Sequence, residues 1–359
     1  MKQATLVKEL PLPPWYDPKK VENWARLVKY QDLFQSARAF GETHSIGSAA
    51  LDRLKIALLP IDVQNTFCYP DFELFVRGLS GTGAMDDSRR LAEFIYRNLR
   101  HLTSIHPTMD THRAWAIFHA SFLVNDKGEH PDPHYPTPIT LAEIEQGKWR
   151  VDPKAAFAIT GDGSKYRALQ AHLVHYARKL SEGGKYALTV WPFHAMLGGY
   201  GHALVPSIEE ACFAHSIIRG AQTGFEIKGG NELTENYSIF APEVLTTAGD
   251  RPIDQRNTRF LDILFRNDVV VIAGEAKSHC VAWSIADLLG DIQQRDPALA
   301  QKVYLLEDCT SNVVVPGVID FSQQGDEAFQ RFAAAGMHLV RSTDPISSWP
   351  GIDASQLGS

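Results

Sequence analysis

The sequence predicts an α/β fold in which a parallel sheet is covered by helices on both faces. Apolar, β-branched runs alternate along the chain with segments of helical periodicity, which is typical of such sheets. The clearest strands are 55–62 and 268–274. Further strands are expected at 101–108, 185–191, 224–228, 302–307 and 338–341, and helices at 21–40, 86–99, 141–146, 165–181, 207–220, 255–266 and 326–335.

Charge and cysteine usage exclude several classes of function. The chain of 359 residues has a net charge of −7, which argues against a nucleic-acid-binding protein. No apolar run reaches membrane-spanning length, and the N-terminus lacks a signal-peptide core. The cysteines are scattered and form no C-x-x-C pair: Cys68, Cys212, Cys280 and Cys309. We therefore expect reduced thiols and a cytoplasmic protein.

Polar side chains with catalytic or ligand chemistry follow or end many of the expected strands. In an open parallel sheet, sites form beyond the carboxyl ends of the strands. Residues distant in sequence are therefore predicted to share one edge of the sheet: Asp62, Asp110, His112, Trp191, His194, Lys228 and Cys280.

Cys280 lies where an apolar strand turns into an amphipathic helix. The unpaired N–H groups at a helix N-terminus favour the thiolate over the thiol, so Cys280 is a candidate nucleophile. Asp62 can serve as its base, and Lys228 can hold two anionic partners together. Taken singly, Asp62 could cap a strand end, Lys228 could be a solvated lysine, and Cys280 could be an inert core residue.

A second group of residues has metal-ligand chemistry. Asp110 and His112 are two residues apart and project to the same side of an extended segment, and His119 and His194 follow. One carboxylate with two or three imidazoles suits Zn, Fe or Mn. The competing histidines His130, His134 and His202 are not expected to be ligands. Phe67 and Trp191 could sandwich a flat ring, or could simply be core residues.

Together these motifs resemble the isochorismatase-like cysteine hydrolases, and among them the nicotinamidase branch. The matching stretches are Asp62-Val-Gln-Asn-Thr-Phe67, Asp110-x-His112, Trp191-Pro-x-His194, Lys228 followed by Tyr237-Ser-x-Phe240, and Gly274-x-Ala-x-x-His-Cys280-Val. The resemblance covers about 54–119 and 185–345. It implies a Rossmann-like three-layer sandwich with a central parallel sheet of about six strands.

The resemblance also implies roles for individual residues. Asp62, Lys228 and Cys280 correspond to a catalytic triad, and the Ala276 and Cys280 N–H groups to an oxyanion hole. Asp110, His112 and His194 correspond to metal ligands, with His119 as an additional one, and Phe67 and Trp191 to the ring-stacking pair. A cis peptide is expected between Glu275 and Ala276.

The chain departs from the family pattern in length and in two local segments. We expect an N-terminal arm at 1–50, a hydrolase domain at 51–345 and a C-terminal tail at 346–359. An insertion at about 120–184 could be a lid, a specificity cap or an oligomer contact. After His194 the family usually has a Cys-containing glycine-rich run, and here Ala195-Met-Leu-Gly-Gly-Tyr-Gly-His202 follows. Glu275 replaces a residue that is commonly apolar.

The expected function is that of a cysteine amidohydrolase that cleaves a C–N bond of a small, nicotinamide-like carboxamide through a thioester. The alternatives are a hydrolase of an N-carbamoyl or ureido compound, an isochorismatase-type hydrolase, and a non-catalytic binding protein that keeps the fold. We expect a divalent metal (Zn, Fe or Mn) and no organic cofactor. The expected partners are a small-molecule amide and further copies of the chain, with no nucleic acid and no membrane.

Overall fold

Within residues 9–183 and 186–357, which the computed structural model describes, five parallel strands form the central sheet. Their order is β13 (His338–Val340), β10 (Val303–Leu306), β9 (Val269–Gly274), β1 (Ile56–Ile61) and β2 (Leu102–Ile105). The pairing of β1 with β9 runs in register from Ile56 opposite Val269 to Ile61 opposite Gly274. Both strands are buried along their whole length, as expected for a sheet covered on both faces.

The expected sheet of about six strands is not confirmed, because the chain leaves the sheet after β2. The His106 N–H still donates to the Leu58 carbonyl, but Pro107 has no N–H with which to continue that ladder. The following strand, β3 (Thr108–Asp110), pairs in parallel with β8 (Glu226–Lys228) as a separate ladder. The single strand expected at 101–108 is therefore two.

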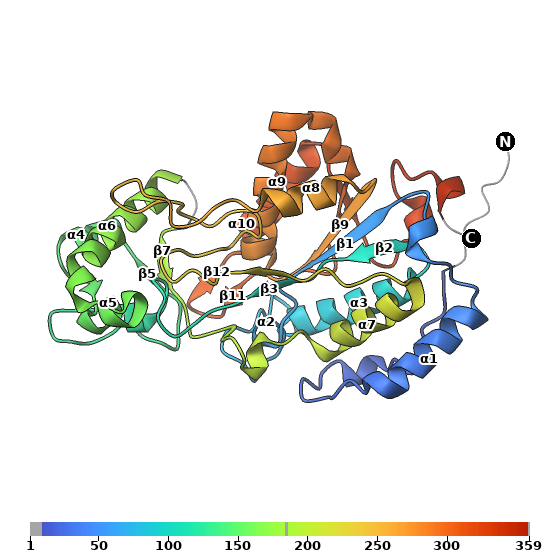
Figure 1. Ribbon diagram of the computed structural model, residues 1–359, viewed down its shortest axis with the longest axis horizontal. Helices are drawn as coiled ribbons and strands as arrows, with labels where there is room; N and C mark the ends of the chain where they lie inside the picture. The colour runs from blue at the N-terminus through green and yellow to red at the C-terminus, as the bar shows by residue number, and fades with distance from the viewer. Residues whose placement is uncertain (1–8, 184–185, 358–359) are drawn as a thin grey trace.

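Helices cover both faces of the sheet (Figure 1). Alternate residues of β1 point to opposite sides, so that Leu58 and Leu59 belong to different hydrophobic clusters. On the Leu58 side lie α2 (Asn65–Cys68), α3 (Gly83–Arg97) and α7 (Pro206–Arg219). On the Leu59 side lie α8 (Thr258–Phe265), α9 (Ala282–Arg295) and α10 (Ser322–Ala334).

The N-terminal helix begins later than the expected 21–40. The Asn23 side chain accepts a hydrogen bond from the Ala25 N–H and holds a turn there, and α1 spans Tyr30–Thr43. The helix buries Leu33, Ala37 and Phe40, which are spaced for one helical face, and packs on α7.

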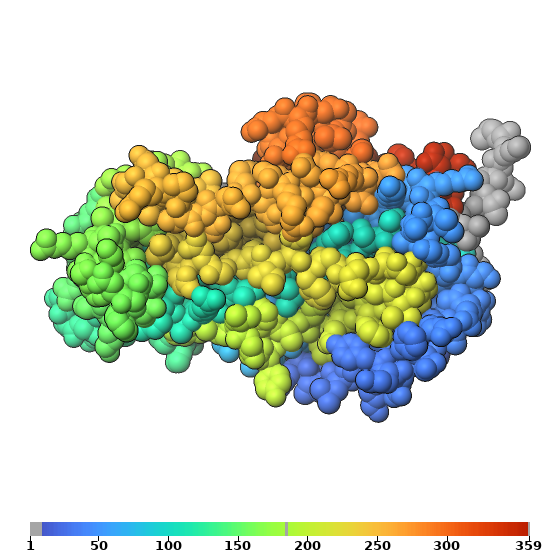
Figure 2. All heavy atoms as spheres, in the orientation of Figure 1, coloured from blue at the N-terminus to red at the C-terminus, as the bar shows by residue number. Residues whose placement is uncertain are grey.

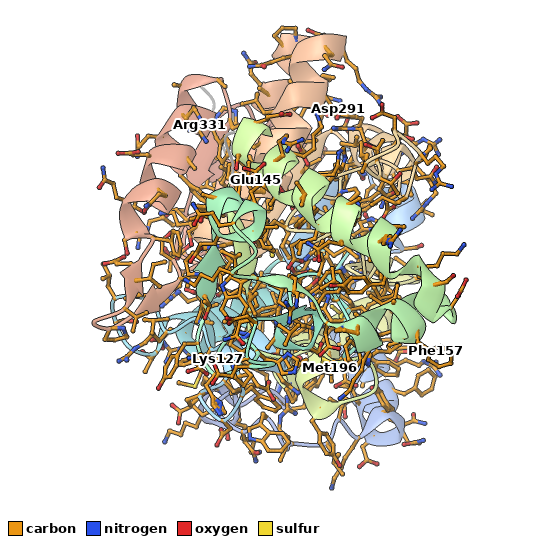
Figure 3. The ribbon with its side chains drawn as sticks, turned by 90° about the vertical axis from the view of Figure 1, so that its left-hand side faces the viewer. Lys127, Glu145, Phe157, Met196, Asp291 and Arg331 are labelled. Carbon is orange, nitrogen blue, oxygen red and sulfur yellow. The ribbon has the colours of Figure 1, made fainter. Side chains whose placement is uncertain are left out.

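The inserted segment forms one end of the molecule (Figures 1 and 2). Its described strands and α-helices are β4 (Leu123–Val124), β5 (Thr137–Ile139), α4 (Leu141–Glu145), β6 (Arg150–Val151), α5 (Pro153–Thr160) and α6 (Tyr166–Gly183). Figure 3 looks onto this end, with α6 running across the face.

The strand expected at 185–191 pairs with a strand of this insertion and not with the parallel sheet. It is observed as β7 (Leu188–Val190), which pairs antiparallel with β5; Lys185 lies outside the described residues. A short apolar run predicts a strand but does not name its partner. After β10, a small hairpin of β11 (Val314–Val315) and β12 (Ile319–Asp320) precedes α10. Among residues 9–183 and 186–357, no helix combines the length and apolar character needed to cross a bilayer.

Candidate active site

The Lys228 ammonium group lies at the centre of a buried group of acidic and thiol side chains. Its Nζ atom is 3.0 Å from Asp62 Oδ2, 3.0 Å from Asp110 Oδ1 and 3.6 Å from Cys280 Sγ. It also donates to the Asn236 carbonyl oxygen at 2.8 Å. The structure thus brings Asp62 and Cys280 within contact range of the Lys228 ammonium group.

Each of these side chains is positioned by a strand end. Asp62 follows β1 with a positive φ of 48°, and its backbone N–H donates to Thr108 Oγ1 at 3.0 Å. The Thr108 hydroxyl in turn donates to the Asp62 carboxylate. Lys228 is the last residue of β8. These contacts fix the Asp62 carboxyl and the ammonium group before any ligand is present.

Cys280 lies in a π-helical turn, Lys277–Val281, between β9 and α9. A cis peptide joins Glu275 and Ala276 immediately before this turn. The Glu275 side chain is buried beneath the turn, where its carboxylate accepts the Ser311 N–H at 3.2 Å. The expected helix start at Cys280 is therefore a wider turn, and α9 begins two residues later.

Burial has the largest effect on the pKa of the Cys280 thiol. Burial raises the pKa of the Cys280 thiol well above its ordinary value, although the positive charge of Lys228 acts to lower it. Burial also raises the pKa of Asp62, again opposed by Lys228. For Lys228 itself, burial lowers the pKa, but Asp110, Asp62 and Cys280 outweigh it and the pKa lies well above the usual range. Burial thus favours the thiol form of Cys280, whereas the positive charge of Lys228 and the helix N-terminus favour the thiolate.

Beside this group, Asp110, His112 and His194 bring one carboxylate oxygen and two imidazole nitrogens within 4.8 Å of one another. Asp110 Oδ2 is 2.8 Å from His112 Nε2 and 3.5 Å from His194 Nε2. All three side chains are buried. The geometry suits a divalent cation held by one oxygen and two nitrogens.

The second partners of the histidines support this assignment. His112 Nδ1 donates to the Gly229 carbonyl at 3.1 Å, and His194 Nδ1 donates to the Pro192 carbonyl at 2.7 Å. In the neutral rings these bonds leave Nε2 as the atom with a free lone pair, which is the usual arrangement around a metal. Gly229 has a φ of +81°, and a Cβ there would lie 2.7 Å from Asp110 Oδ1.

His119 lies at the edge of this cluster. It is not one of the three residues whose ligand atoms lie close together, which are Asp110, His112 and His194. Its ring is 5.7 Å from that of His112 and 6.0 Å from that of His194, between centroids. Its Nδ1 atom donates to the Arg113 carbonyl at 3.0 Å, and its buried Nε2 atom has no partner among the described residues. Burial lowers the pKa of His119 to about 2, so the ring is neutral and Nε2 can coordinate a cation. Two of the competing histidines have other partners: His202 contacts Thr111 and His130 contacts the Leu123 carbonyl.

A cavity of about 40 Å³ opens between the thiol and the metal-ligand cluster. Its wall is mainly apolar and includes Phe67, Leu74, Val76, Trp191, Tyr237 and Val313, together with Ala276, His279, Cys280, Asp110, His194 and Glu235. Phe67 and Trp191 therefore line the same cavity, and the Trp191 indole N–H donates to the Tyr237 hydroxyl at 3.0 Å. A larger hollow of about 520 Å³ lies along β8 and residues 254–259, but neither Cys280 nor His194 lines it.

Sequence reasoning missed two residues of this site, Gln64 and Glu235. Gln64 accepts the Asp110 N–H and donates to the Asp110 carbonyl, both at 2.8 Å, which fixes the backbone of Asp110. The alternation Asp62-x-Gln64 just after a buried strand was the available signal. Glu235 lies in a polar segment between recognised motifs, and nothing in the local pattern marks it as a pocket residue.

No family model matches this sequence, and no curated protein matches it. Three of the similar solved structures are a nicotinamidase/pyrazinamidase from Acinetobacter baumanii, the yeast nicotinamidase Pnc1p and a pyrazinamidase from Pyrococcus horikoshii in complex with zinc. Their sequence identities to this chain are 18%, 17% and 16%, and the TM-scores are 0.45, 0.46 and 0.42. The matches cover 81%, 79% and 80% of this chain and 97%, 99% and 99% of those proteins. At these values an activity does not transfer from those proteins to this chain.

Proposed function

We propose that this protein is a cysteine amidohydrolase that releases ammonia from a small carboxamide through a thioester on Cys280. The proposal rests on the contacts that the buried Lys228 ammonium group makes with Cys280 and Asp62. Lys228 Nζ lies within 3.6 Å of a thiol and within 3.0 Å of the carboxylate that could deprotonate it. A nucleophile, a base and a group that orients both are what acyl transfer by a cysteine requires.

In the first half of the reaction, Asp62 takes the proton of the Cys280 thiol as the sulfur bonds to the amide carbonyl carbon. Lys228 keeps its charge and offsets the negative charge of the pair throughout. The N–H groups of Ala276 and Cys280, two residues that line the cavity, would hold the oxyanion. Asp62 then returns the proton to the leaving nitrogen, the C–N bond breaks, and ammonia departs from a thioester.

In the second half, Asp62 takes a proton from a water molecule whose oxygen attacks the thioester carbonyl. The C–S bond breaks, the carboxylic acid leaves, and the sulfur recovers its proton. A divalent cation held by Asp110, His112 and His194, with His119 as a further ligand, would polarise the substrate and lower the pKa of a coordinated water. Zn, Fe and Mn fit this donor set.

The size and lining of the cavity favour a small, flat substrate. The space open to the centres of water-sized groups is only about 40 Å³, which favours a small ligand, and the aromatic walls at Phe67 and Trp191 suit a planar group. Nicotinamide and similar ring carboxamides meet both conditions, whereas a peptide or a large amide does not.

The proposal is tested by ammonia release from nicotinamide, pyrazinamide, N-carbamoyl and ureido compounds. Cys280→Ala should reduce release by at least about 10⁴-fold, since the nucleophile is lost. The matched control is Cys212→Ala, because Cys212 is also a buried cysteine but lies on α7, away from the cavity. Full turnover by Cys280→Ala would overturn the mechanism.

A further inference from the structure

The cavity wall contains a buried carboxyl group that the proposed reaction does not use. Glu235 is 4% exposed and lines the cavity together with Cys280 and Trp191. Its Oε1 atom accepts the Asn236 N–H at 2.9 Å, while its buried Oε2 atom has no hydrogen-bond partner among the described residues. Buried carboxyl oxygens are usually paired, so a missing partner in a substrate pocket points to the ligand.

Glu235 is not a member of the metal-ligand cluster. The three close ligand atoms belong to Asp110, His112 and His194. Burial, followed by the negative charge of Asp110, raises the pKa of Glu235 to about 8, although His194 and Lys228 act in the opposite direction. The existing partners of the carboxylate do not outweigh burial, so the unliganded carboxyl group is mostly protonated at pH 7. An N–H donor facing Oε2 would stabilise the carboxylate and lower this pKa, so that Oε2 accepts in the complex.

The insertion holds Glu235 in place. The backbone N–H of Glu235 donates to the Tyr176 hydroxyl at 3.2 Å, and His172 Nε2 donates to the Leu233 carbonyl at 2.8 Å. Tyr176 and His172 are both buried residues of α6. The segment that presents Glu235 to the cavity is thus fastened to the inserted helix at two points, four residues apart and hence on one helical face.

We propose that Glu235 is a specificity-determining residue whose Oε2 atom accepts a hydrogen bond from an N–H donor on the body of the substrate. This inference rests on the proposed amidohydrolase function and narrows its substrate class. The preferred substrates are small planar carboxamides that carry a second N–H group, such as an amino or ureido nitrogen, besides the scissile amide. A site built to receive such a donor discriminates strongly against an analogue that lacks it.

The test compares benzamide, its three amino-substituted isomers and nicotinamide, which share one ring size. In the wild-type protein, kcat/KM for at least one aminobenzamide should exceed that for benzamide by about tenfold or more. Glu235→Met should bring this ratio to about one, and Glu235→Gln, whose amide oxygen still accepts, should keep most of it. Glu235→Leu replaces the methionine variant if that variant does not fold. Glu145→Leu on the outer face of the insertion is the control and should leave the ratio unchanged (Figure 3).

Binding of the same compounds to Cys280→Ala, measured by calorimetry, separates this inference from the proposed function. One outcome is that the aminobenzamides bind more tightly than benzamide, that Glu235→Met abolishes this difference, and that the wild type hydrolyses none of the compounds. This outcome would contradict the proposed amidohydrolase function and support the role of Glu235. Hydrolysis with the same amino preference in wild type and Glu235→Met would overturn the role of Glu235 and leave the function standing. A Glu235-dependent preference for nicotinamide over every aminobenzamide would also overturn it, because the ring nitrogen of nicotinamide is an acceptor.

Discussion

Lys228 Nζ and Asp110 Oδ1 lie 3.0 Å apart, so one buried ion pair joins the candidate triad to the candidate metal cluster. Asp110 also faces His112 through its other oxygen at 2.8 Å. The same carboxylate therefore faces the ammonium group with one oxygen and the histidines with the other. A substitution of Lys228 should consequently change the metal affinity as well as the reactivity of Cys280.

Lys228→Met should destabilise the metal-free protein by about 3–5 kcal/mol, because it leaves the buried carboxylates of Asp62 and Asp110 without their cation. Urea unfolding in the presence of chelator measures the loss. Lys148→Met removes the exposed pair with Glu143 and should change the free energy of unfolding by about 1 kcal/mol or less. Equal stability of the two variants would contradict the central role given to Lys228.

Gly229→Ala should lower metal occupancy while leaving the fold intact. A Cβ at residue 229 would lie 2.7 Å from Asp110 Oδ1 and from His112 Cε1, so both ligands would have to move. Gly230→Ala is the matched control, since a Cβ there meets no atom within 4 Å. Elemental analysis of the purified variants gives the metal content per chain. A Gly229→Ala protein that binds as much metal as Gly230→Ala would show that the cluster tolerates this displacement.

The residues that follow strands could be predicted from sequence because their placement depends on short-range patterns. A β-branched run marks β1 and β9, and the carboxyl ends of such parallel strands share one edge. That reasoning predicted the meeting of Asp62 and Cys280 across the sheet. Lys228 lies on β8, outside the central sheet, yet reaches the same edge because β8 pairs with β3, whose Thr108 binds the Asp62 N–H.

The parts that could not be predicted depend on which distant segment packs where. Strand β7 pairs antiparallel with β5, which belongs to the insertion. The apolar run at 188–190 predicts a strand but does not identify this partner. Glu235 faces the cavity because α6 holds its segment through Tyr176, a contact between residues 59 positions apart. The raised pKa of Cys280 has burial as its largest cause, which a helix-terminus argument does not include.

His119→Ala should weaken metal binding by roughly 10–100-fold, and His194→Ala should weaken it further, because His194 is one of the three close ligand donors. In the metal-free protein, His119→Ala should cost less stability than a typical buried truncation, since the unpartnered Nε2 atom is removed with the ring. Competition with a chromophoric chelator measures the affinities. Wild-type affinity in His119→Ala would limit the cluster to Asp110, His112 and His194.

Glu235 should make the unfolding free energy of the metal-free protein fall as pH rises from about 4.5 to 8. The pKa of Glu235 is about 8 in the folded protein and 4.5, the ordinary value, in the unfolded chain. Between pH 4.5 and 8 the folded state therefore binds more protons than the unfolded state. The stabilisation is fully present below pH 4.5 and is lost as the pH passes 8. Glu235→Gln cannot ionise, so its advantage over the wild type should grow with pH, by at most about 1.4 kcal/mol per pH unit. Urea titrations at pH 5, 6, 7 and 8 test this, and parallel profiles for the two proteins would mean that Glu235 is already ionised and paired.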